Sequence, residues 1–444
     1  MLGIALLLLS LVLYPTKYKK WSVLLFILFS MDFMRLLSNE VLGVKSEDLA
    51  FVYMLVTNIY SYFYERDEFD EYIWINRSAF WMSIFLLFSV LFSYLYYGFT
   101  SYQILQGGRQ LFLFLSYYFL RKSKPEEIEW IIDALFKITL VHAILYIIQV
   151  LTGWDVLSYG EASIDKVTAV ARYYNYPTLL PFFLSFCMLY TNYQGRHISI
   201  LAIVILLIAL FCTQGRTYII TTIAVLLFGI ALRGPASRVL YGTIILLICI
   251  IPFLDLLTMR FSNEGETSDD ITSILDGSFK KDVIEGRQQQ GTLSYRFAWV
   301  YERAIYLNER PLGEKCFGLG MISDSQTDVV YSRYHFITGL LNEENDEPTQ
   351  LNTPDISWGN ILTKFGYLGG MLFLLLWIYI SAVVYNSRHN HPIILCGFVF
   401  ICSLWLCSIA DSNLSQSGFL TFPMLLATYA CRIETEEEEE NIES

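Results

Sequence analysis

Long apolar blocks recur along the whole sequence, and this repetition limits what the chain can fold into. Residues 201–212, 218–232 and 369–384 contain no Asp, Glu, Lys or Arg. A membrane-spanning helix needs about 17–25 mostly apolar residues, and the sequence offers apolar blocks on this scale again and again. Only 16% of the 444 residues are charged. The blocks therefore predict an all-α polytopic integral membrane protein with about 12–13 transmembrane helices.

The apolar runs divide the chain into candidate spans and connections. The candidate spans are residues 2–14, 21–34, 49–64, 79–97, 105–120, 131–151, 178–193, 198–212, 217–232, 239–257, 361–384, 393–410 and 419–431. About ten of them form a first helical bundle at residues 1–258, and three more lie at 356–432. A large loop at 259–355 separates the two groups, and an acidic tail follows at 433–444.

The distribution of basic residues predicts how these spans are oriented. One alternating set of short connections contains 13 Lys and Arg residues, whereas the other contains 6. Connections rich in Lys and Arg stay in the cytoplasm. The basic set then places the tail at 433–444 in the cytoplasm, where its run of Glu residues is expected to be solvated and disordered. The same rule places the loop at 259–355 outside.

The external loop is long enough to carry structure of its own. Residues 262–291 are polar and are typical of a mobile loop. In residues 294–308 the apolar side chains recur at nearly helical spacing, which predicts an amphipathic helix. Pro311 should end this helix, because proline cannot continue the helical hydrogen bonding. We therefore expect an external loop that carries short helices.

Three arginines near the predicted outer face are candidate ligands for an anion. Arg216 lies between two apolar spans, where a guanidinium is costly unless it faces a cavity, a carboxylate or an anion. Arg172 precedes Tyr173, an aromatic residue of the kind that stacks on sugar faces. Arg296 lies on the predicted loop helix. If they converge, they suit a pyrophosphate, since arginine donates two parallel N–H groups to phosphate. Each could instead be an interfacial anchor or a surface charge.

No pattern in the sequence predicts a metal or a cofactor. The eight cysteines show no CxxC or Cys/His spacing, and there is no Asp-x-Asp motif on a soluble domain. A glycine-rich phosphate loop between a strand and a helix is also missing. We therefore expect neither a cofactor nor a metal, and no nucleic-acid partner.

Four short motifs together resemble the bacterial O-antigen polymerase and ligase family. Residues 211–217 (FCTQGRT) are similar to the family's Ser/Thr-x-x-Arg-Thr helix start. Residues 294–320, with SYRFAW followed by PLGEKCFGLG, resemble its outer-loop pattern S-x-R-x-x-W…P…G-x-G. Residues 360–369 (NILTKFGYLG) and 172–177 (RYYNYP) are similar to two of its span entries. The order and sidedness of these motifs make the set more specific than any one of them.

The resemblance implies a membrane enzyme similar to C-type glycosyltransferases, acting without a metal. It implies the bacterial cytoplasmic (inner) membrane, with the large loop on the periplasmic side. The donor would be an oligosaccharide repeat unit on undecaprenyl pyrophosphate, and the acceptor another lipid-linked repeat unit. A chain-length regulator protein and membrane lipid would be partners. The product would be O-antigen or a related surface polysaccharide.

The resemblance also suggests roles for individual residues. Arg216 and Arg296 would hold the pyrophosphate, while Asp355 or His335 would orient the acceptor hydroxyl. The remaining substrate-binding candidates, for pyrophosphate and sugar, are Arg172, Tyr173, Trp299 and Arg333. Asp355 also stands before an apolar span and could simply cap that helix. His335 could equally be a surface or packing residue.

Three alternatives to a polymerase remain open at this point. The ligase branch of the family typically has a histidine just before the span after the loop, whereas residues 352–358 (NTPDISW) contain none. This departure favours a polymerase over a ligase that transfers finished polymer to a lipid or protein. A flippase or other transporter would predict inverted repeats and charges near the bilayer midplane. No repeat is found. A non-enzymatic scaffold is the third alternative.

Overall fold

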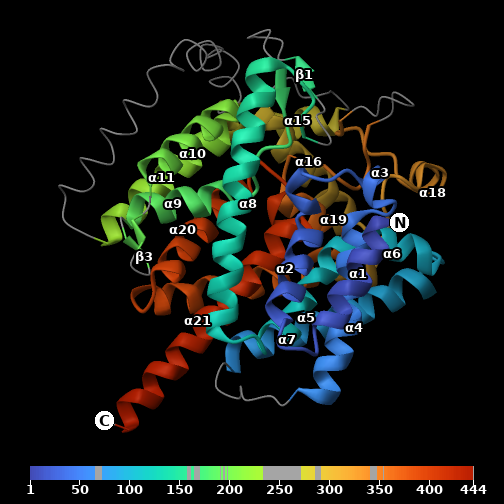
Figure 1. Ribbon diagram of the computed structural model, residues 1–444. Helices are drawn as coiled ribbons and strands as arrows, with labels where there is room; N and C mark the ends of the chain where they lie inside the picture. The colour runs from blue at the N-terminus through green and yellow to red at the C-terminus, as the bar shows by residue number, and fades with distance from the viewer. Residues whose placement is uncertain are drawn as a thin grey trace.

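The computed structural model describes residues 1–65, 73–157, 162–164, 171–190, 192–193, 196–197, 199–233, 272–285, 292–340, 348–353 and 355–443. It is a bundle of helices with two short antiparallel strand pairs, β1–β2 and β3–β4 (Figure 1). The predicted all-α polytopic membrane fold is confirmed. Helices α15 and α16 of the large loop lie towards the opposite end of the bundle from the carboxyl terminus.

The first half of the described chain contains α1 Leu2–Leu13, α2 Lys19–Ser30, η1 Asp32–Arg35, α3 Asn39–Leu42, α4 Ser46–Tyr64, α5 Ile73–Leu95, α6 Ser101–Phe112, η2 Leu113–Ser116, α7 Tyr117–Leu120, α8 Pro125–Thr152, β1 Ala162–Ile164, β2 Ala171–Tyr173, α9 Leu180–Leu189, β3 Asn192–Tyr193, β4 Arg196–His197, α10 Ile200–Cys212 and α11 Arg216–Arg233. The second half contains α15 Ser278–Ile284, α16 Thr292–Asn308, α17 Leu312–Phe317, α18 Thr327–Arg333, α19 Ser357–Asn386, η4 Ser387–His389, α20 Pro392–Cys407, η5 Asn413–Ser415 and α21 Ser417–Glu443.

Four helices in the described part of the chain are long and apolar enough to cross a membrane. They are Trp74–Leu95, Pro125–Thr152, Arg216–Arg233 and Ser357–His389. Four shorter apolar helices of 10–17 residues accompany them: Leu2–Leu13, Leu180–Leu189, Ile200–Cys212 and Pro392–Cys407. Every predicted span overlaps a helix except 239–257, which lies outside the described residues, and the predicted span 178–193 ends in β3. The number of helices that cross the bilayer stays a prediction.

Helix α8 shows how local sequence sets the ends of a span. Pro125 occupies its first turn, where a missing N–H leaves no hydrogen bond unmade. Glu126 and Glu127 follow, and carboxylates there complement the positive end of the helix dipole. The helix ends at Gly153, which adopts the left-handed conformation (φ 71°) that glycine reaches without strain.

The large loop is joined to α19 by two glycines that meet backbone to backbone. A Cβ atom added to Gly318 would lie 2.5 Å from the backbone nitrogen of Gly366, so no larger residue fits. Both glycines have positive φ (73° and 63°), and Gly366 interrupts the helical geometry of α19. The Leu319 N–H donates to the Thr363 carbonyl at 2.8 Å. Two of the family-like motifs therefore contact each other directly.

Two predictions about polar segments differ from the structure. The predicted amphipathic helix at 294–308 is confirmed as α16, but part of the expected loop at 262–291 forms α15. Phe279 is buried there and its ring contacts Phe297 (6.3 Å) and Tyr301 (5.7 Å) of α16, which explains the order. The acidic tail is also helical rather than disordered. The tail continues α21. Extending an existing helix costs less free energy than starting a new one, and glutamate is a good helix former.

Candidate functional site

Four charged residues from distant parts of the chain form a group that we call the arginine–carboxylate cluster. Its members are Arg172, Arg296, Asp355 and Asp411. Arg296 on α16 places its Nη2 atom 3.7 Å from Oδ1 of Asp355, which precedes α19. Both side chains are largely shielded, with exposed fractions of 13% and 27%. Helix α16 of the large loop and the segment that enters α19 thus share an ion pair.

Asp411 lies in the connection between α20 and η5 and brings the cluster together. Its carbonyl accepts hydrogen bonds from the Ser357 N–H (3.0 Å) and the Ser357 hydroxyl (2.8 Å), which holds the connection against the start of α19. Burial raises the pKa of Asp411 to about 7, with a smaller contribution in the same direction from the Asp355 carboxylate. The guanidinium groups of Arg296 and Arg172 lower the same pKa, so the Asp411 carboxylate interacts electrostatically with both cations.

The sequence analysis did not select Asp411. One signal was available, because Asp411 is a lone carboxylate between the predicted spans 393–410 and 419–431. Such a residue at the end of a span is costly and commonly functional. The predicted orientation puts this connection on the same side as the large loop. Its proximity to Arg172 and Arg296, however, depends on how α20 packs.

Asp355 pairs with an arginine of the cluster and does not cap α19. The N-cap residue of α19 is Ile356, and no side chain caps the helix. The alternative prediction of a helix cap is therefore wrong, because the carboxylate pairs with Arg296 instead. Burial raises the pKa of Asp355, and the Arg296 guanidinium opposes this rise. The Asp355 N–H donates to the Thr353 hydroxyl at 3.2 Å, which anchors the backbone.

Arg172 and Arg216, far apart in the sequence, meet at the turn between α10 and α11. The Nη2 atom of Arg172 lies 3.4 Å from the position that a Cβ on Gly215 would take. Its Cζ also lies 4.8 Å from the ring centroid of Tyr174. Gln214 has φ 51°, which sharpens this turn. Arg216 follows directly as the first residue of α11, so the two arginines share one corner of the molecule.

The arginines of this region leave hydrogen-bond donors unused. Among the described residues, the buried Nε atoms of Arg172 and Arg296 donate to no partner. Arg216 is half-buried and shows no ion pair or hydrogen bond to another side chain in the same described part. It also stands at the positive end of the α11 dipole, where a cation is unfavourable and an anion is favoured. Unpaired buried donors of this kind are available to bind a polar or anionic ligand.

Trp299 and Tyr173 are placed differently from the prediction that they touch sugar. Trp299 is fully buried, with the Arg303 guanidinium 3.3 Å from its ring centroid and Gly359 against its ring edge. Tyr173 is only 4% exposed and packs in the apolar core. Neither residue presents a free ring face, because both fill space between helices. Their roles in this structure are packing roles.

Arg333 and His335 lie outside the cluster. Arg333 donates from Nη2 to the Tyr97 carbonyl at 2.8 Å and stacks 4.9 Å from the Phe99 ring centroid. It therefore ties α18 to the connection between α5 and α6. His335 is exposed, and no hydrogen bond or ion pair within the described residues joins it to the cluster. Asp411 replaces it as the second carboxylate or base beside Asp355.

The chemistry of the cluster combines fixed positive charge with a carboxylate that titrates near neutrality. Guanidinium groups stay charged and suit phosphate oxygens. A carboxylate with a pKa near the working pH is well matched to accept a proton. Within the described residues, no group of three or more His, Cys, Asp or Glu side chains is arranged to hold a metal ion. The expectation of a metal-free reaction stays a prediction.

Comparison with known proteins identifies the central part of the chain. Residues 201–374 match the family model described as O-antigen ligase, whose members are membrane enzymes acting on O-antigen. This segment contains Arg216, Arg296 and Asp355, whereas Arg172 and Asp411 lie outside it. The search of curated proteins found no match. The predicted resemblance is confirmed by this match: residues 201–374 match the O-antigen ligase model, which is consistent with the O-antigen polymerase and ligase family.

Proposed function

We propose that this protein polymerises undecaprenyl-pyrophosphate-linked oligosaccharide repeat units into O-antigen or a related surface polysaccharide. The reaction takes place at the outer face of the bacterial cytoplasmic membrane, with the large loop in the periplasm. One observation carries the proposal: the O-antigen ligase domain supplies Arg216, Arg296 and Asp355, and the fold adds Arg172 and Asp411 beside them. Membrane lipid and a chain-length regulator are the further partners in this proposal.

The leaving group explains the need for arginines. The acceptor hydroxyl oxygen attacks the anomeric carbon of the donor, and the bond from that carbon to the pyrophosphate oxygen breaks. The departing undecaprenyl pyrophosphate takes the electron pair and gains negative charge. Arg216 and Arg172, which lies against the turn before Arg216, would bind this charge together with Arg296, which acts on Asp411 electrostatically as Arg172 does. Removing one such donor typically raises a barrier by about 2.7–4 kcal/mol.

The acceptor hydroxyl must lose its proton during the same step. Asp411 is assigned this role because its pKa of about 7 lets it be ionised and still bind a proton well. Asp355 then has a positioning role, since its ion pair with Arg296 orients that guanidinium. In this scheme, arginines balance the pyrophosphate charge without a metal.

A ligase is the second candidate, because the matching family model carries that description. Its chemistry would be the same, with a lipid or protein as the acceptor of finished polymer. The lack of a histidine in residues 352–358 favours the polymerase. A flippase or transporter has less support, since neither the motifs nor the family domain belongs to that class.

Deletion of the gene separates the two enzymes. A polymerase mutant should carry surface glycan with a single repeat unit, whereas a ligase mutant should accumulate polymer on undecaprenyl pyrophosphate. Complementation with Arg216→Ala should fail to restore polymer ladders although the protein is in the membrane. Arg310→Ala is the matched control, because Arg310 is an external arginine bonded to Tyr306 away from the cluster. Normal ladders with Arg216→Ala would contradict the proposed site.

A further inference from the structure

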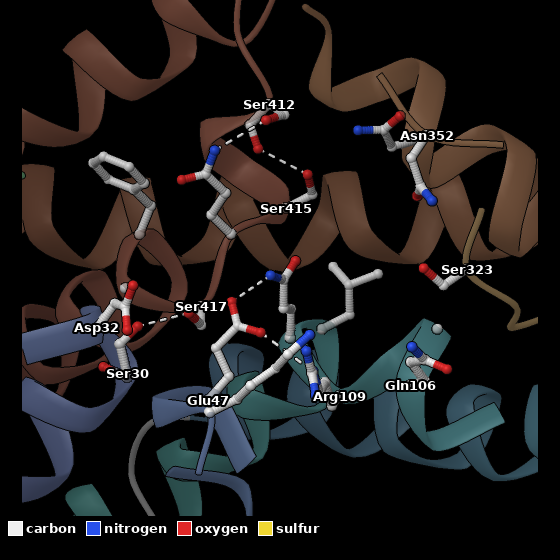
Figure 2. Close-up of a pocket in the computed structure, with 18 of the residues that line it drawn as sticks. Ser30, Asp32, Glu47, Gln106, Arg109, Ser323, Asn352, Ser412, Ser415 and Ser417 are labelled. Carbon is white, nitrogen blue, oxygen red and sulfur yellow. Dashed lines mark hydrogen bonds and ion pairs between the residues drawn. The ribbon is translucent and has the colours of Figure 1, made fainter. Parts of the chain in front are cut away.

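A large polar cavity lies next to the arginine–carboxylate cluster and has no role in the proposed reaction so far. Its volume is about 760 Å³, which falls within the range of about 300–1,000 Å³ typical of ligand sites. Its wall includes residues of η1, the start of α4, α6, the large loop, the start of α19 and the connection before α21. Figure 2 shows Asp32 and Ser30 on one side, with Gln106, Ser323 and Asn352 on the other. No member of the cluster lines it, and neither does Arg216.

The cavity wall continues directly into the cluster. Thr353 lines the cavity, and its hydroxyl accepts the hydrogen bond from the Asp355 N–H at 3.2 Å. Asn360, also in the lining, holds Thr353 by two hydrogen bonds of 2.8 and 2.7 Å. Ser412 lines the cavity and directly follows Asp411. The cavity wall and the two carboxylates thus belong to the same two segments of chain, one or two residues apart.

The charges of the lining largely cancel, which argues against a pyrophosphate in the cavity. The lining contains four basic and three acidic residues. Arg35 pairs with Asp32 at 2.5 Å, and Arg109 pairs with Glu47 at 3.2 Å, as Figure 2 shows for the second pair. The Lys364 ammonium donates to the Gly107 carbonyl at 2.9 Å. Two of the four basic side chains are thus paired with carboxylates here, whereas Arg216 has no ion pair within the described residues.

The uncharged groups of the lining suit a ligand rich in hydroxyls. Sixteen of the 28 lining residues are Ser, Thr, Asn or Gln, whose side chains can both donate and accept hydrogen bonds. Only one aromatic side chain, Phe419, is among them. A lipid tail would require an apolar wall, and an inorganic anion would require net positive charge. A saccharide matches this wall better than either.

Part of the cavity wall, residues 32–35, has a strained backbone. The four consecutive residues Asp32, Phe33, Met34 and Arg35 all have φ between 49° and 61°, although none is glycine. Left-handed turns of this kind are unfavourable for residues with side chains and concentrate at ligand-binding positions. Phe33 and Met34 are buried, so packing holds the turn in place. The turn thereby directs Asp32 and Arg35 to the cavity, where both are lining residues.

We propose that this cavity binds the oligosaccharide part of a lipid-linked substrate, holding the sugar units next to the bond that is made or broken. The inference rests on the proposed function, because it takes the arginine side of the site as the pyrophosphate side. The cavity then determines which repeat unit the enzyme accepts. Sugar recognition and pyrophosphate recognition lie on different walls of one site.

The test fills the cavity and measures each half of the substrate separately. Purified full-length protein is titrated with two probes: the free repeat-unit oligosaccharide released from the cells' own surface polysaccharide, and sugar-free undecaprenyl pyrophosphate. Ser323→Trp should weaken oligosaccharide binding about tenfold or more by steric exclusion, while pyrophosphate-lipid binding changes less than about twofold. Ser332→Trp is the matched control, because Ser332 is an exposed serine of the same loop, outside the cavity.

A second variant keeps the test valid if tryptophan prevents folding. Gln106→Leu retains the volume of a half-exposed side chain and removes its amide, and it should weaken oligosaccharide binding about fivefold. Unchanged oligosaccharide binding in a folded variant would overturn the cavity proposal, as would loss of pyrophosphate-lipid binding alone. The proposed polymerase function fails separately, if cells lacking the protein still make polymer ladders.

Discussion

Replacing Asp411 with Asn tests both the electrostatics and the chemistry of the cluster. The pKa of Asp411 rises from its ordinary value of 3.8 to about 7, mainly because the carboxyl group is buried. The folded protein therefore binds this proton more tightly than the unfolded protein does. The contribution of Asp411 to the free energy of unfolding is therefore fully present below about pH 4. It is lost as the pH rises towards 7 and the buried carboxyl group loses its proton.

The size of this effect follows from the two pKa values. The difference between 3.8 and about 7 corresponds to about 4 kcal/mol of folding free energy, as an upper figure. Asn carries no charge at any pH, so Asp411→Asn should remove this pH dependence. The variant should be more stable than the wild type at pH 8 and similar at pH 4. Activity should nevertheless fall by about 10²–10⁴-fold, since the proton acceptor is missing.

The assay combines thermal unfolding in detergent with polymerisation by the same preparation. Melting temperature is measured at pH 4, 6 and 8 for the wild type, Asp411→Asn and Asp328→Asn. Asp328 is exposed on α18, so its variant serves as a control for the loss of one carboxylate. Wild-type activity should rise with pH up to about 7. An unchanged pH dependence of melting in Asp411→Asn, or full activity in it, would refute this assignment.

Three further predictions concern the remaining parts of the site and its support. Arg216→Ala should lower the polymerisation rate about 10²–10³-fold with an unchanged melting temperature, because it removes one donor to the leaving group. A parallel drop in melting temperature would mean that Arg216 is structural. Trp299→Ala should lower the free energy of unfolding by about 3–5 kcal/mol, as expected for a buried aromatic side chain, and thermal melting checks this. Gly366→Ala should destabilise the protein by more than about 1 kcal/mol in the same assay, since its φ is 63° and the backbone of Gly318 leaves no room. A variant that melts like the wild type would contradict the packing described at that position.

Local sequence was sufficient to predict most of the helices and their order along the chain. A segment in lipid must satisfy its own backbone hydrogen bonds, so a long apolar block has few choices other than a helix. The amphipathic helix at 294–308 and its end before Pro311 could be predicted for the same reason, because periodicity and proline act over a few residues. The motif set at 172–369 was likewise enough to indicate the family whose domain matches at 201–374.

Local sequence was misleading wherever the partner of a side chain lies far away. Trp299 belongs to a family-like motif, yet its ring is covered by Arg303 and Gly359. Residues 278–284 are polar enough to suggest a loop, but Phe279 packs on α16 and orders them. In both cases tertiary packing decides whether a side chain faces solvent or another helix.

Residue order alone was enough to predict a helical membrane protein that resembles the O-antigen polymerase and ligase family, with arginines and a carboxylate as site candidates. Their contacts appear only in the folded protein: Arg172 lies beside Gly215, Arg296 lies beside Asp355, and both arginines lower the pKa of Asp411. Helix formation depends on hydrogen bonds between residues that are four positions apart, so it can be predicted from neighbouring residues in the sequence. Convergence depends on the packing of α16 and α20 against α19 and of α11 against α20. The sequence pattern of a single chain does not give the distances between such helices.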